Sequence, residues 1–141
     1  MNKNQKIDVF SQIEPRVKLA SLINTNGIIN RVELSESQEI LQTSIVLLKK
    51  GRLVEPHFHN STKRTTIGTQ EVWIVQKGKA IVKIFDLDNS VRSQYRIKKG
   101  TIVFLLRGGH SISKITNNLL LIEVKNGPYW GSEVDKTSIT D

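Results

Sequence analysis

The chain is a succession of short strand-like runs separated by glycine and asparagine turns, and this pattern most constrains its fold. The runs are rich in β-branched residues and leucine, and several alternate apolar and polar positions; they cover residues 17–23, 40–48, 71–76, 79–86, 93–97, 102–106 and 119–124. Turn signals lie at residues 24–27, 77–78, 88–89 and 99–100. No stretch has a convincing helical period. Strands at this spacing predict an all-β sandwich or barrel.

The length of 141 residues predicts a single domain that is large enough to bury its own core. The polar residues at both ends are expected to be loosely held. We therefore expect a flexible N-terminal segment over residues 1–15, a β-barrel domain over residues 16–135 and a C-terminal tail over residues 136–141.

Composition limits the location and the partners. The chain has no cysteine, so any metal must be held by nitrogen and oxygen ligands. The first residues lack the apolar region of a signal peptide, and no apolar run reaches the roughly 18 residues of a membrane span, so we expect a cytoplasmic protein with no membrane segment. The net charge of +8 is compatible with an anionic small molecule. The lysines and arginines are scattered, which argues against nucleic-acid binding.

All three histidines lie in two short motifs. His57 and His59 are two positions apart, and on a strand such residues face the same way. His110 follows Gly108-Gly109, a pair that permits tight backbone turning. Each histidine taken alone is better explained as a surface residue, and the placement of all three together carries the information.

A carboxylate joins the histidines at the start of the run over residues 71–76. The pattern Gly51-x5-His57-x-His59, followed by Glu71-x6-Gly78, resembles the first motif of the cupin family. The loop between His59 and Glu71 is longer than that motif usually has.

A later pattern resembles the second motif of the cupin family, namely Gly100-x5-Leu106-x-Gly108-Gly109-His110. The resemblance covers roughly residues 51–114 and implies a single-domain jelly-roll β-barrel. It also implies one divalent transition metal at the centre of the barrel. Carried over to this chain, the metal ligands are His57, His59, Glu71 and His110.

Within the family, the chain is most similar to small single-domain, RmlC-like cupins associated with polysaccharide and sugar-nucleotide metabolism. Residues 68–72, 108–110 and 122–129 carry this similarity. It implies a small-molecule substrate, such as a carbohydrate or a sugar nucleotide. It also implies a homodimer that pairs sheet edges, for which the region up to Asn30 could supply an edge.

The metal and the reaction stay open. Three imidazoles and a carboxylate suit Fe, Mn, Ni, Co or Zn, and isomerase, epimerase and oxygenase chemistry all remain possible for such a centre. One alternative is a metal-free sugar-nucleotide epimerase or isomerase, with a histidine base and Tyr95 or Tyr129 as the acid. A second is a non-catalytic module that binds a small molecule.

Four further residues are candidates for chemistry, each with a simpler interpretation beside it. Glu123 interrupts an apolar run and could be a general acid or base, unless that end of the strand is solvated. Tyr129 could donate a proton, and Tyr95 could contact a sugar, although such aromatics more often pack in a core or interface. Arg64 could bind a phosphate or carboxylate of the substrate, although it also suits a solvated loop.

Overall fold

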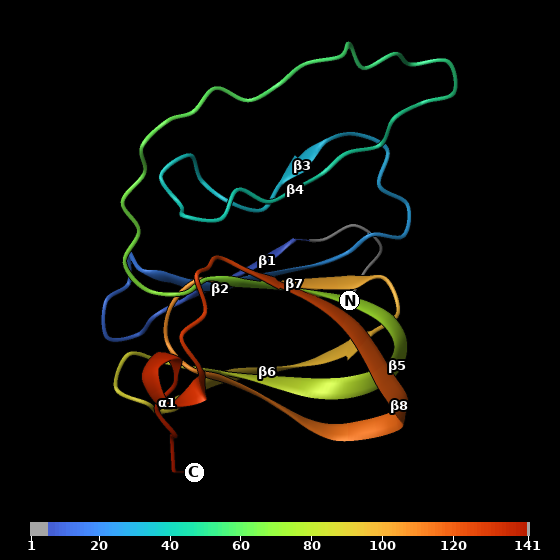
Figure 1. Ribbon diagram of the computed structural model, residues 1–141. Helices are drawn as coiled ribbons and strands as arrows, with labels where there is room; N and C mark the ends of the chain where they lie inside the picture. The colour runs from blue at the N-terminus through green and yellow to red at the C-terminus, as the bar shows by residue number, and fades with distance from the viewer. Residues whose placement is uncertain (1–5, 141) are drawn as a thin grey trace.

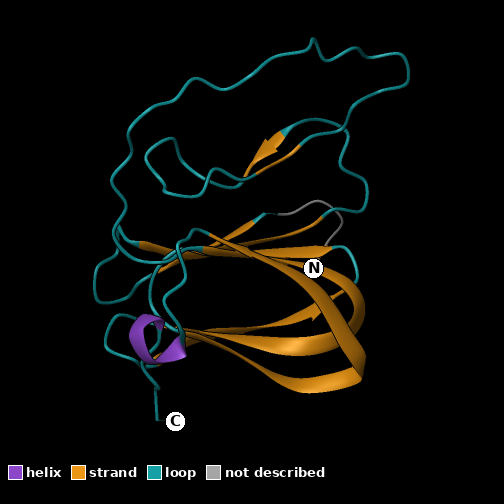
Figure 2. Ribbon diagram, in the orientation of Figure 1, coloured by secondary structure: helices purple, strands orange, loops and turns teal. Residues whose placement is uncertain are grey.

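The computed structural model describes residues 6–140, and these are almost entirely β-structure (Figures 1 and 2). The described elements are β1 (Ile7–Phe10), β2 (Lys18–Asn24), β3 (Val32–Glu33), β4 (Ser44–Ile45), β5 (Glu71–Phe85), β6 (Val91–Lys98), β7 (Thr101–Leu105), β8 (His110–Lys125) and the short helix α1 (Ser132–Asp135). The all-β prediction is confirmed. Within residues 6–140, no helix has the length and apolar character needed to cross a membrane.

Six strands form one curled antiparallel sheet. Its order is β1-β2-β7-β5-β6, and β8 pairs with β5. The first part of β5 pairs with β7 and its second part with β6, while β8 follows β5 along almost its whole length. The sheet therefore bends along β5 and β8, so that β1, β2 and β7 form one layer and β6 lies in the other (Figure 1).

Strand β5 continues through the position where the sequence pattern predicts a turn, so the prediction at Lys77-Gly78 is wrong. The pairing of β5 with β8 shifts register on both sides of Lys77. Gly78 has φ +85°, and a Cβ there would lie 2.7 Å from the carbonyl oxygen of Asn118 on β8. A glycine thus lets both strands bend together at this point without ending either of them. The predicted turns near residues 24–27, 88–89 and 99–100 are confirmed.

Two apolar clusters lie on the two faces of the layer formed by β2, β7 and the start of β5. The cluster inside the curl contains Leu19, Leu22, Trp73, Val75, Val82, Ile84, Ile97, Val103 and Leu105, among others. The outer cluster contains Ile23, Leu34, Val72, Ile102, Phe104 and Leu106, and the partly buried Leu41 and Ile45 pack against it. The alternation of side chains along β5 and β7 thus places one set inward and the other beneath the β3–β4 hairpin.

The segment over residues 46–69 differs most from the strand pattern. Only Ser44–Ile45 of the predicted strand over residues 40–48 forms a strand, in β4. Residues 46–69 form no strand and are exposed, and in Figure 1 they extend beyond the β3–β4 hairpin, away from the curled sheet. His57 and His59 lie in this segment, so the strand expected to carry them is not formed.

Both ends of the described chain lie against the curled sheet (Figure 1). Residues 1–5 of the predicted N-terminal segment, and residue 141 of the predicted tail, lie outside the described residues. Within that segment, β1 pairs with β2. Strand β8 leads to the C-terminal segment, residues 126–139, which lies with α1 at the open end of the curl (Figure 1).

Candidate functional site

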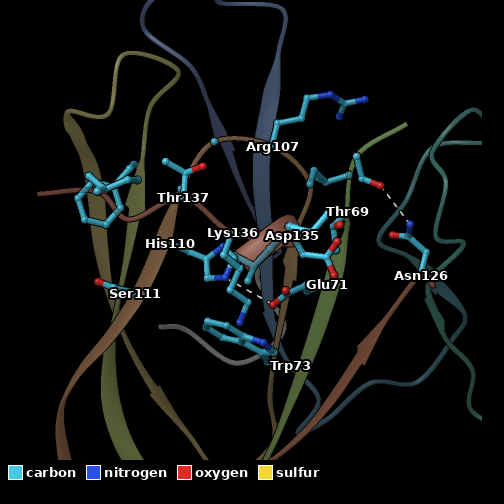
Figure 3. Close-up of a pocket in the computed structure, with 18 of the residues that line it drawn as sticks. Thr69, Glu71, Trp73, Arg107, His110, Ser111, Asn126, Asp135, Lys136 and Thr137 are labelled. Carbon is cyan, nitrogen blue, oxygen red and sulfur yellow. Dashed lines mark hydrogen bonds and ion pairs between the residues drawn. The ribbon is translucent and has the colours of Figure 1, made fainter. Parts of the chain in front are cut away.

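A pocket of about 1080 Å³ lies at the open end of the curled sheet (Figure 3). Its walls come from the start of β5, the end of β7, the turn over residues 106–109, the start of β8 and the C-terminal segment. Thr66, Gly68 and Thr69, at the end of the exposed segment, complete the rim. The pocket therefore lies where the two predicted motifs approach each other.

Glu71 and His110 meet in this pocket. Each is the first residue of a strand, Glu71 of β5 and His110 of β8. A Glu71 carboxylate oxygen, Oε2, lies 3.5 Å from Nε2 of His110. The Glu71 side chain is 9% exposed and that of His110 is 31% exposed. Interaction with His110 lowers the pKa of Glu71 below its ordinary value and outweighs the opposite effect of burial. Glu71 is therefore a charged, oriented acceptor in the pocket.

Trp73 lies beneath this pair (Figure 3). It follows Glu71 by two positions on β5, so both side chains point into the curl. Its indole ring makes an edge-to-face contact with the His110 imidazole, with ring centroids 5.0 Å apart and planes at 84°. The residue is buried, and its indole Nε1 has no hydrogen-bond partner among the described residues. Trp73 thus fixes the position of the His110 ring while its own N–H group stays unsatisfied.

The two glycines before His110 allow the close approach of this turn to β5. Gly108 has φ +69°, and a Cβ there would lie 2.4 Å from the carbonyl oxygen of Phe85. A Cβ on Gly109 would lie 2.2 Å from Cδ1 of Ile139, in the C-terminal segment. Gly108 is therefore required by packing, and the pair leads the chain into β8 with His110 facing the pocket.

The C-terminal segment covers one side of the pocket and is held at its base. The Asn126 side chain accepts a hydrogen bond from the backbone N–H of Gln70 at 2.8 Å and donates one to the carbonyl of Gly68 at 3.1 Å. Lys136 lines the pocket, and its positive charge contributes to the lowered pKa of Glu71. The predicted tail thus supplies polar side chains to the pocket, from residues 136–138.

The other two predicted metal ligands lie elsewhere. His57 and His59 are exposed, with their ring centroids 5.4 Å apart, and Nδ1 of His57 contacts the carbonyl oxygen of Glu55 at 2.8 Å. Neither residue lines the pocket. Among residues 6–140, no group of three or more histidine, aspartate or glutamate side chains is close enough to hold a metal. The structure therefore brings together two of the four predicted ligands, and the complete set stays a prediction.

The four remaining candidates do not line the pocket. The Glu123 carboxylate makes an ion pair with Lys125 at 3.1 Å. Tyr129 is 55% exposed, and Nζ of Lys125 lies over its ring, 4.5 Å from the ring centroid, in a cation–π contact. Tyr95 packs against the inner apolar cluster. The Arg64 guanidinium lies 3.5 Å from the carbonyl oxygen of the nearby Thr62.

Sequence reasoning did not identify Trp73, Arg107, Asn126 or Lys136 as residues of the site. A tryptophan in an apolar strand is typical of packing, so the pattern contains no signal for an unsatisfied N–H group. The C-terminal residues follow the last strong strand, and their return to the pocket depends on tertiary contacts such as those of Asn126. Comparisons with protein-family models, curated proteins and solved structures found no match to this chain.

Proposed function

We propose that this chain is a small metal-binding cupin whose jelly-roll barrel binds a small polar molecule, such as a carbohydrate or a sugar nucleotide, beside the metal. One observation carries the proposal. Glu71 comes from the first predicted motif and His110 from the second, and their side chains lie 3.5 Å apart in a large pocket. Two unrelated surface residues from segments far apart in the sequence would not be expected to meet in one pocket.

The donor chemistry of the pair suits a divalent transition metal. An imidazole nitrogen and a carboxylate oxygen are common ligands of Fe, Mn, Ni, Co and Zn. Glu71 carries the negative charge that a cation requires, because its pKa is held below the ordinary value. When bound, such a metal would polarise an oxygen of the substrate as a Lewis acid.

The chain between the pocket and His59 is long enough to let His57 and His59 approach this pair. Thr66 already lines the pocket and comes seven residues after His59, a length that spans up to about 23 Å when extended. The outer edge of β8 is unpaired within the described residues. We propose that the segment around His57 pairs with this edge beside His110, which would turn both imidazoles towards Glu71.

The exposed apolar side chains of this segment favour such a closure. Leu53, Val54 and Phe58 are 66%, 55% and 86% exposed. Pairing with the sheet would bury part of this surface and satisfy backbone groups on both strands. Closure would also cover the pocket and so exclude water from a reacting substrate.

Metal analysis of protein purified without a histidine tag tests the proposal. We expect one equivalent of divalent metal per chain, and loss of that metal in His57→Ala, Glu71→Gln and His110→Ala. Glu123→Gln is the matched control, since it neutralises a carboxylate that lies outside the pocket. Protein that holds no metal, and takes up none when metal is added back, would contradict the proposal and leave the metal-free epimerase or isomerase and the non-catalytic binding module as the alternatives.

We further propose a homodimer formed by sheet-edge pairing. Strand β1 pairs only with β2 among the described strands, so its other edge is free for a second copy. Light scattering after size-exclusion chromatography tests this proposal. We expect the mass of a dimer for the parent chain and the mass of a monomer when Phe10, a 40% exposed residue of β1, is replaced by proline, which removes an N–H donor and is poorly tolerated in paired strands. Circular dichroism like that of the parent shows that the variant is folded.

A further inference from the structure

The strongest unexplained feature of the pocket is the unsatisfied N–H group of Trp73. The residue is 5% exposed, and its Nε1 has no hydrogen-bond partner in the described part of the chain. Buried polar groups in native proteins are nearly always hydrogen-bonded, so each exception calls for a missing partner. Trp73 lines the pocket, which places that partner within the pocket contents.

The surroundings of Trp73 define the chemistry of the partner. An indole N–H group is a donor only, so its partner must be an acceptor. The nearby Glu71 carboxylate already interacts with His110. The Trp73 ring is held edge-on against that same imidazole. The donor is therefore held at the depth of the Glu71–His110 pair. Because the Nε1 atom is itself buried, an oxygen atom of a bound molecule reaches it when the neighbouring side chains shift on binding.

We propose that the Trp73 indole is a ligand-recognition group, which donates a hydrogen bond to a carboxylate or hydroxyl oxygen of the small polar molecule in this pocket. The inference rests on the proposed function for its ligand class. A site built around a buried donor discriminates strongly against a molecule that lacks the acceptor, because the donor is then left unpaired. Trp73 thus contributes specificity, whereas Glu71 and His110 bind the metal.

Nuclear magnetic resonance of the two indole N–H groups tests the inference directly. The chain has two tryptophans, and Trp130→Phe assigns their signals. Sodium acetate supplies a carboxylate probe, glycerol supplies hydroxyl groups, and sodium chloride at equal concentration is the salt control. We expect saturable movement of the Trp73 signal with acetate or glycerol. The Trp130 residue also lines the pocket but is 70% exposed, so its signal should move much less.

The titration is run on metal-free and zinc-loaded protein, and zinc content is measured separately. Failure to bind zinc would contradict the proposed metal centre without deciding the role of Trp73. A Trp73 signal that responds to neither probe in either form would overturn the inference. So would movement equal to that of Trp130.

Substitution gives a second measurement. Trp73→Phe keeps an aromatic ring against His110 and removes only the donor nitrogen. We expect its affinity for the responding probe to fall about tenfold, the scale of one hydrogen bond to a charged or strongly polar group. Tyr95→Phe, which removes a donor from an aromatic side chain outside the pocket, is the control. Unchanged affinity in folded Trp73→Phe would overturn the inference. If that variant does not fold, the signals of the parent protein decide it.

Discussion

The Glu71 carboxylate lies 3.5 Å from Nε2 of His110, and this contact joins the first residues of two strands that pair along almost their whole length. The contact lowers the pKa of Glu71 against the effect of burial. In this antiparallel pairing Glu71 lies opposite Lys125 and His110 lies opposite Ile84, so the curl of the sheet, and not the pairing itself, brings the two side chains together. The pair is the fixed part of the candidate metal centre.

Glu71 should stabilise the metal-free fold in a pH-dependent way. Its pKa is lower in the folded chain than its ordinary value of 4.5. The contribution is therefore complete above about pH 4.5 and is lost as the pH falls through the lower, folded value. We expect Glu71→Gln to reduce the free energy of unfolding by about 1 kcal/mol at pH 7, and the difference from the parent to vanish in acid. Urea unfolding in a chelator across this range measures it; a difference that grows in acid would contradict it.

Asp86, which does not line the pocket, should show the same sign of dependence. Burial raises the pKa of Asp86. Hydrogen bonds from the Ser11 hydroxyl and from the backbone N–H groups of Gln12 and Leu87 lower this pKa by more, so that it lies below the ordinary value of 3.8. Its contribution is thus complete above about pH 3.8 and lost as the pH falls through the folded value. We expect Asp86→Asn to be less stable than the parent at pH 7 and to approach it as the pH falls through the folded pKa. Glu133→Gln, on exposed α1, is the control and should follow the parent throughout.

Gly108 and Gly109 should respond differently to the same substitution. Gly108→Ala places a Cβ 2.4 Å from a backbone oxygen at positive φ, and we expect it to cost about 2 kcal/mol or more. Gly109→Ala meets the end of the Ile139 side chain, which can rotate away, so its cost should be smaller. Its main effect should be faster hydrogen exchange in residues 136–139. Equal losses of stability with unchanged exchange would contradict this difference.

Glu39 should be the residue that holds the β3–β4 hairpin to the sheet. Its carboxylate accepts hydrogen bonds from both terminal nitrogens of Arg107, at 3.0 and 3.1 Å, and from the Gln70 amide. We expect Glu39→Ala to cost about 1–2 kcal/mol, because it leaves the buried Gln70 amide unpaired and removes the paired hydrogen bonds to exposed Arg107. The control is Glu33→Ala, which breaks an exposed ion pair with Arg31 and should cost less than about 0.5 kcal/mol. Chemical unfolding compares them, and similar losses would refute the role of Glu39.

The strand pattern predicted the sheet well wherever the strands are buried on at least one face. Strand β2 covers Lys18–Asn24 and β7 covers Thr101–Leu105, close to the predicted runs. The pattern failed at Gly78, because a glycine at positive φ marks a bend in a continuous strand as well as a turn. It also failed over residues 46–48 and around His57 and His59, where apolar residues lie outside both clusters. Such a run has strand propensity, but a strand forms only where a partner edge is available.

The candidate site was predictable in part for a related reason. Spacing identified Glu71 and His110, which begin strands and occupy positions set by the sheet. It could not show the role of Trp73, since an unsatisfied N–H group is a property of three-dimensional packing. Nor could it show the return of Lys136 to the pocket, which depends on contacts of the C-terminal segment.

X-ray absorption spectroscopy of zinc-loaded protein tests the metal centre most directly, because it counts the imidazole ligands. If His57 and His59 close onto the pair of Glu71 and His110, the parent should show three imidazoles and a carboxylate around the metal. The variant in which both His57 and His59 are alanine should show one imidazole. A parent spectrum with a single imidazole, unchanged in that variant, would contradict the closure and the four-residue centre.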